Sequence, residues 1–147
     1  MSTESWTREA RGILIDALLE HPLTWSERLR PRPDDFEAVF GPHAKAVSEG
    51  YGVLWENPVL PGPKVDQTQL LVTVQSAREL ATDPKAARRF PGGFAAVVPV
   101  LPADSVWATW KFTRPGELSG MAYDGLCRRS ADRWVWFPKL WRVLELD

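Results

Sequence analysis

Asp124 is the residue whose position most suggests chemistry. It stands in a predicted strand between Tyr123 and Gly125, where an acidic side chain is disfavoured by propensity. If the side chain points inward, it lines any pocket that the sheet encloses, and loss of water raises its pKa towards that of a general base. If it points outward, it is a solvated strand residue or forms a turn with Gly125. We expect the outward position.

A second candidate is the segment 128–142, in which basic and aromatic residues are interleaved. Its tryptophans are Trp134, Trp136 and Trp141, and its one acidic residue is Asp132. Stacking rings among basic groups can bind single-stranded nucleic acid, and an acidic protein surface would fit them better still. The simpler interpretation places Trp134 and Trp136 in the core and leaves the arginines in water at the tip of a hairpin. The basic residues are Arg128, Arg129, Arg133, Lys139 and Arg142.

Other chemistry-bearing patterns are sparse. The two histidines, His21 and His43, lie in separate segments, and Cys127 is the single cysteine, so the close spacing of zinc ligands is missing. There is no P-loop and no G-x-S-x-G elbow. The FPGG sequence at residues 90–93 follows a predicted helix and is typical of a helix stop. We therefore expect no metal and no cofactor, and we expect Cys127 to be a buried, inert side chain.

The composition is that of one globular domain, expected over residues 1–147. Of the 147 residues, 44% are hydrophobic and 25% charged, and the net charge is −1, so no global field draws the chain to nucleic acid or membranes. Neither a signal peptide nor an apolar run of membrane-spanning length is recognisable. A lone cysteine fits a reducing compartment, and we expect a cytoplasmic protein. Eight tryptophans suit pocket walls and interfaces as well as cores.

The first half of the chain has the periodicity of helices. Helical spacing continues over residues 34–40 and 44–55, separated by a glycine and a proline. Residues 28–33 form an extended basic connector. A capping-box sequence at Ser76 and Glu79 then starts a short helix, with a second start at Asp83. One face of the first helix is formed by Trp6, Ala10, Ile13, Leu14, Ala17 and Leu18.

The second half has the alternation of strands. In the clearest strand Trp110 and its alternate neighbours face the core, which puts Trp107 on the other face. A hairpin is predicted across residues 128–132, and Gly125 is expected to mark a bulge. The fold class is therefore α+β, with N-terminal amphipathic helices packed on a curved, mostly antiparallel C-terminal sheet. The predicted strands are residues 70–75, 94–101, 105–113, 121–127 and 133–137.

This order of elements resembles that of the nuclear transport factor two-like cone fold. The resemblance implies a curved sheet that wraps a helix and encloses a pocket. Enzymes of that fold commonly pair an acid with a histidine or a tyrosine, but here Tyr123 falls on the strand face opposite Asp124. In size and composition the chain is also similar to small bacterial immunity proteins that block toxins.

Two functions follow as expectations. The first is a non-catalytic protein that recognises another protein, such as a toxin, through an aromatic and charged face. The alternative is a domain that binds or transforms a small apolar molecule in an aromatic-lined pocket, with Asp124 as its polar group and Tyr123 beside it if the protein is an enzyme. Nucleic-acid binding comes third, and the oligomeric state is left open. The expected contact residues are Trp107, Arg128, Arg129, Arg133 and Trp141.

Overall fold

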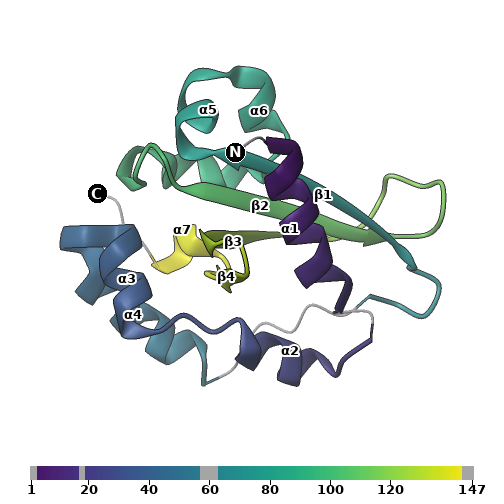
Figure 1. Ribbon diagram of the computed structural model, residues 1–147, viewed down its shortest axis with the longest axis horizontal. Helices are drawn as coiled ribbons and strands as arrows, with labels where there is room; N and C mark the ends of the chain where they lie inside the picture. Colours follow the sequence, from purple (N-terminus) through teal and green to yellow (C-terminus); the bar gives the residue numbers. More distant parts are fainter. Residues whose placement is uncertain (1–2, 17–18, 57–62, 144–147) are drawn as a thin grey trace.

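The computed structural model describes residues 3–16, 19–56 and 63–143 (Figure 1). Ala17 and Leu18, expected at the end of the first helix, lie outside these ranges. Helices come first and most strands later along the chain, which confirms the predicted α+β class. Within the described residues, no helix is both long and apolar enough to cross a membrane.

Four strands form one open antiparallel sheet. Their order in space, β1-β2-β3-β4, is their order in the chain. Val72 of the first strand lies opposite Trp110 of the second, and Leu126 of the third lies opposite Trp136 of the fourth. The strands are β1 (Gln69–Ser76), β2 (Val106–Thr113), β3 (Ala122–Ser130) and β4 (Arg133–Trp136).

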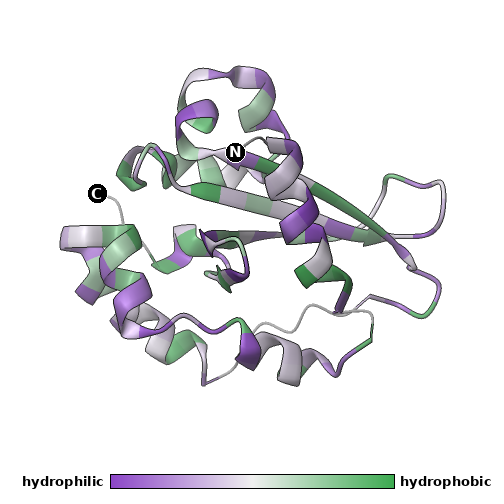
Figure 2. Cartoon of the chain, in the orientation of Figure 1, coloured by the Kyte–Doolittle hydropathy of each residue, from purple (hydrophilic) through white to green (hydrophobic). Residues whose placement is uncertain are grey.

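Different helices cover the two faces of this sheet. Trp25 of α2 lies 6.1 Å from Trp110, ring centre to ring centre, on one face. On the other face Phe40 of α3 lies 6.5 Å from Trp107. Long stretches of β1 and β2 carry hydrophobic residues in Figure 2, as a sheet buried on both sides requires. The helices are α1 (Thr3–Ile15), α2 (Pro22–Arg28), α3 (Pro33–Phe40), α4 (Ala44–Leu54), α5 (Ala77–Thr82), α6 (Pro84–Arg88) and α7 (Leu140–Val143).

Two helix starts lie where the sequence places them. The Ser76 Oγ accepts a hydrogen bond of 3.2 Å from the Glu79 backbone N–H, which starts α5. The Asp83 carboxylate accepts one of 2.9 Å from the Lys85 N–H, which starts α6. Helix α2, however, was not predicted. The sequence feature that marks its start is His21, whose ring accepts a hydrogen bond from the Leu23 N–H. A proline follows His21 in the first turn of the helix.

The predicted strand at 94–101 is wrong. The segment forms two short 3-10 helices, η3 (Gly92–Ala96) and η4 (Val98–Val100). Local hydrogen bonds satisfy its backbone: the Phe94 N–H donates to Pro91 O, and the Val97 N–H donates to Phe94 O. Its buried side chains recur at helical spacing rather than at every second residue, and Pro99 has no N–H for a sheet. The buried residues are Phe94, Val97, Val98 and Leu101.

The bulge predicted at Gly125 is present. The register of β2 against β3 shifts between Ala108 and Trp110, and Gly125 has a φ of 87°, which only glycine adopts readily. The backbone of the segment after β4 also passes very close, because the Phe137 N–H donates to Gly125 O over 2.8 Å. A Cβ on Gly125 would lie 1.9 Å from Phe137 O. No side chain fits there.

Trp107 is buried completely, at 0% exposure, so its expected place at a partner surface is corrected. Its ring lies 5.6 Å from Phe94 and 5.9 Å from Phe137, centre to centre. The rings of Phe94 and Phe137 cover Trp107 on one face of the sheet, and the ring of Trp25 covers Trp110 on the other. Trp110 is 1% exposed, as expected for a core residue.

Because both faces are buried, Trp107→Ala and Trp110→Ala should each lower the free energy of unfolding by about 3–5 kcal/mol, as truncation of large core side chains does. Urea unfolding followed by circular dichroism measures both losses. Leu19→Ala, at a side chain 83% exposed, is the control and should change the value by less than about 0.5 kcal/mol. A loss below about 1 kcal/mol for Trp107→Ala would contradict its place in the core.

Candidate functional site

Two of the arginines expected at a partner surface bind a buried carboxylate instead. Asp35 of α3 is 0% exposed. Arg133 donates to its two oxygens over 2.6 and 2.5 Å, and Arg129 Nε donates over 3.0 Å. Burial alone would raise the pKa of Asp35, but the hydrogen bonds from Arg133, from the Arg32 backbone and from Arg129 lower it to about 2. The carboxylate therefore stays ionised and ties α3 to the β3–β4 hairpin.

The third arginine ties α1 to the same hairpin. Arg128 Nε donates to Glu9 Oε1 over 2.7 Å, and Trp134 Nε1 donates to the same oxygen over 3.2 Å. The side chains of Arg128 and Glu9 are only 19% and 17% exposed. The basic patch predicted at the hairpin is thus the place where two N-terminal helices attach.

Cys127 is 1% exposed, which agrees with the expected buried thiol. Burial raises the pKa of this thiol far above its ordinary value, so the reactive thiolate is disfavoured.

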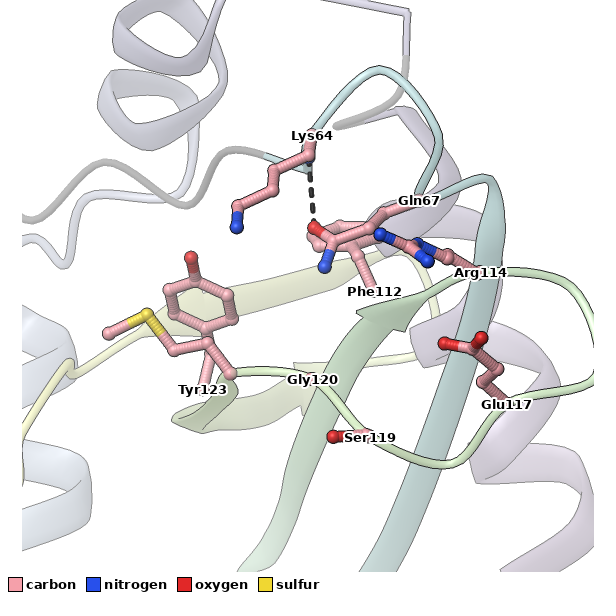
Figure 3. Close-up of a pocket in the computed structure, with 9 residues that line it drawn as sticks. Lys64, Gln67, Phe112, Arg114, Glu117, Ser119, Gly120 and Tyr123 are labelled. Atoms are coloured by element: carbon pink, nitrogen blue, oxygen red, sulfur yellow. Dashed lines mark hydrogen bonds between the residues drawn. The ribbon is translucent and has the colours of Figure 1, made fainter.

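A wide cavity of about 570 Å³ opens between the loops around residues 64–67 and 114–121 (Figure 3). The Lys64 amino group and the Tyr123 hydroxyl project into the same space in the figure. Arg114, at its edge, pairs with Asp66 over 2.8 Å. Among the described residues that line this cavity, none has a buried polar atom without a partner. The described lining therefore offers no unpartnered buried polar group that would select a particular ligand.

A second cavity, of about 340 Å³, lies where β3 begins and β4 ends, and Asp124 lines it. The expected outward position of Asp124 is thus wrong, because the residue is only 4% exposed. Three aromatic side chains share the lining, and Tyr123 also borders the first cavity. The lining residues are Pro91, Met121, Ala122, Tyr123, Asp124, Trp136, Pro138, Lys139, Trp141 and Arg142.

The Asp124 carboxylate is half satisfied. The Lys139 backbone N–H donates to it, whereas the buried oxygen Oδ2 has no hydrogen-bond partner. Burial raises the pKa of Asp124 from 3.8 to about 7, although the hydrogen bond and the charge of Lys139 act in the opposite direction. When Asp124 is ionised, the fold therefore holds a buried carboxylate with one oxygen that lacks a hydrogen-bond donor.

Two features fix the loop after β4, whose Lys139 N–H donates to this carboxylate. Lys139 has a φ of 50° and is the one non-glycine residue with positive φ in the described chain, a conformation that costs free energy and often marks functional sites. One residue earlier, the Tyr51 hydroxyl of α4 donates to Pro138 O over 2.9 Å. Burial, with the charge of Asp124, raises the pKa of Tyr51 well above its ordinary value, so the hydroxyl keeps the proton that it donates.

Trp141 of α7 forms one wall of the Asp124 cavity and packs against a glycine. A Cβ on Gly93 would lie 2.8 Å from Cδ2 of the Trp141 ring, whereas a Cβ on Gly92 would meet nothing within 4 Å. The FPGG sequence thus does more than stop a helix, since Gly93 leaves room for the wall.

The structure brings three of the expected residues together: Asp124, Tyr123 and Trp141 line one cavity. Tyr51, Trp136 and Lys139 complete the site and were not predicted for it. Tyr51 fits a helical stripe and carried only the signal of a core residue, whereas Trp136 and Lys139 belong to the segment 128–142, which was singled out for a different kind of binding. Within the described ranges, no three His, Cys, Asp or Glu side chains are grouped to hold a metal ion.

Removing the buried carboxylate of Asp35 should destabilise the fold. Asp35→Asn should lower the free energy of unfolding by about 2–4 kcal/mol, because Arg129 and Arg133 lose the charge that compensates them. Asp34→Asn, at the exposed neighbouring position, is the matched control and should change it by less than about 0.5 kcal/mol. Equal effects of the two variants in urea unfolding would show that the ion pairs do not hold α3.

Asp124 should make the protein less stable as the pH rises. The folded state keeps this proton up to about pH 7, whereas the ordinary pKa of 3.8 means that the unfolded chain loses it near pH 4. Unfolding therefore releases a proton between these values, and the free energy of unfolding falls by about 3–4 kcal/mol from pH 4 to 8.

Asp124→Asn should remove this fall, so that the variant is more stable than the wild type at pH 8 and similar to it at pH 4. Asp104→Asn, at an exposed position, is the control and should run parallel to the wild type. Parallel curves for Asp124→Asn in urea unfolding across this range would contradict the buried acid.

Comparison with protein-family models, with curated proteins and with solved structures finds no match for this chain. No relative therefore connects it to the cone fold or to the immunity proteins that its element order and size resemble. The chemistry of the Asp124 cavity is what remains to indicate a function.

Proposed function

We propose that the protein binds a small, mainly apolar molecule in the Asp124 cavity, without transforming it. The observation that carries the proposal is that Asp124, whose buried Oδ2 lacks a hydrogen-bond partner, lines a cavity that three aromatic residues also line. The ligand would lie against Tyr123, Trp136 and Trp141 and donate a hydrogen bond to this oxygen.

A buried acceptor without a partner costs about 1–3 kcal/mol. An N–H or O–H group of a ligand removes that cost, so the same oxygen provides both affinity and orientation. Small-molecule sites are mostly apolar hollows with few polar groups, and their volumes begin near 300 Å³. The cavity of about 340 Å³ suits a ligand with one ring system or a short chain.

We favour binding over catalysis because the two tyrosines of the described site, Tyr51 and Tyr123, are held in other contacts. The Tyr51 hydroxyl is engaged with Pro138 O. The Tyr123 ring stacks on Trp110 with 5.6 Å between ring centres, which holds it as a wall. General acid–base chemistry needs partners within hydrogen-bond reach of the reacting atoms.

Recognition of another protein, the function expected first from the sequence, stays a prediction. Its expected anchors are engaged inside the fold: Trp107 is buried, Arg128 binds Glu9, and Arg129 and Arg133 bind Asp35. Trp141 is the one expected contact residue that also lines the cavity.

Indole and 1-methylindole are matched probes, since indole has an N–H donor that its methylated analogue lacks. In isothermal titration calorimetry at pH 8, where Asp124 is ionised, we expect saturable binding of indole, at least about tenfold tighter than that of 1-methylindole, as a hydrogen bond to a charged group provides. Asp124→Asn should remove the difference. With Lys139 N–H donating to the amide oxygen, the new NH₂ group faces the ligand and accepts nothing.

Two glycine variants control for the shape of the cavity. Gly93→Ala should weaken indole binding because the new methyl group displaces the Trp141 ring. Gly92→Ala meets no atom and should bind as the wild type does. The proposal is wrong if neither probe binds saturably. It is also wrong if Asp124→Asn and Gly93→Ala both bind indole as tightly as the wild type does.

A further inference from the structure

We infer that the ligand of the Asp124 cavity carries two opposite charges: a cationic nitrogen at its buried end and an anionic group at its outer end. This inference rests on the proposed function and adds the chemical class of the ligand. It is carried by the distribution of charge in the lining, where an acid lies deep and two basic side chains lie nearer to solvent.

The buried end is set by Asp124. A carboxylate that is 4% exposed, with one oxygen unpartnered, is poorly compensated when ionised. A protonated amine supplies both the hydrogen bond and the opposite charge, and such charge-assisted bonds are stronger than neutral ones. Trp136 and Trp141, which also line the cavity, are side chains whose rings attract a cation.

The outer end is set by Lys139 and Arg142. Lys139 is partly buried and Arg142 is exposed, and both line the cavity. Within the part of the chain that is described, neither side chain donates a hydrogen bond or forms an ion pair, and the Lys139 side chain acts on Asp124 only through its charge. An anionic group of the ligand would find two unpaired cations there.

The two ends exclude simpler ligands. A ligand with only a cation is attracted by Asp124 but repelled by Lys139 and Arg142. A ligand with only an anion meets the reverse. A short apolar spacer between an amine and a carboxylate places each charge beside its opposite, as in an ω-amino acid with an aromatic or aliphatic core.

The probe is 4-(aminomethyl)benzoate, with benzylamine and 4-methylbenzoate as matched molecules that each lack one charged group. In calorimetric titrations at pH 7.5 and low salt, we expect it to bind at least about tenfold more tightly than either analogue, since charged hydrogen bonds each contribute more than neutral ones.

Variants separate the two ends. Asp124→Asn should reduce the affinity for 4-(aminomethyl)benzoate to that of 4-methylbenzoate. Arg142→Gln and Lys139→Gln should each reduce it towards that of benzylamine. Lys139→Gly gives a second version, because the φ of 50° suits glycine and the backbone N–H to Asp124 is retained. Arg114→Gln, in the neighbouring cavity, is the control and should leave the affinity unchanged.

The outcomes are distinct. If benzylamine binds as tightly as 4-(aminomethyl)benzoate, or if the Arg142 and Lys139 variants bind it as the wild type does, the two-charge ligand is wrong. The proposed function still stands in that case if indole binds as described. If neither indole nor any of these three probes binds saturably, both proposals are wrong.

Discussion

The contact between Gly125 and the backbone of Phe137 is the constraint on which the site depends. Because a Cβ at position 125 would lie 1.9 Å from Phe137 O, only glycine lets β3 approach the chain leaving β4 this closely. The bulge at this point turns Asp124 into the protein. The same contact sends Phe137 into the aromatic core beside Tyr51. The residues that follow it then carry the carbonyl for Tyr51 and the N–H for Asp124.

The fold uses its charges in two ways. At the hairpin, Asp35 and Glu9 are fully paired with arginines, and the low pKa of Asp35 shows a carboxylate whose ionised form is favoured. At the opposite end of β3, Asp124 has the reverse character, since burial outweighs its partners. The difference lies in the number of donors. Asp35 receives hydrogen bonds from two guanidinium groups and a backbone N–H, whereas Asp124 receives one from a backbone N–H.

Much of the fold follows from local sequence. Alternation identifies β2, the Ser76–Glu79 pair starts α5, and Gly125 marks the bulge. The segment 94–101 was misread because its apolar residues are too dense for one period to stand out. The direction of Asp124 was misread for a different reason: a bulge interrupts the alternation that assigns faces. Tyr51 and Lys139 join the site through tertiary packing, which no local pattern encodes. The sequence shows the positive charge of the arginines. No local pattern identifies Glu9 of α1 and Asp35 of α3, the acids that bind them.

Each of the four N-terminal helices has a partner far along the chain. Glu9 binds Arg128, Trp25 contacts Trp110, Asp35 binds Arg133, and Tyr51 binds the carbonyl of Pro138. During synthesis a ribosome therefore releases four helices before the strands that cover them exist. Contacts over such separations also need long loops to close, which slows folding. The nascent helices must therefore keep their apolar faces from wrong partners until Pro138 has emerged.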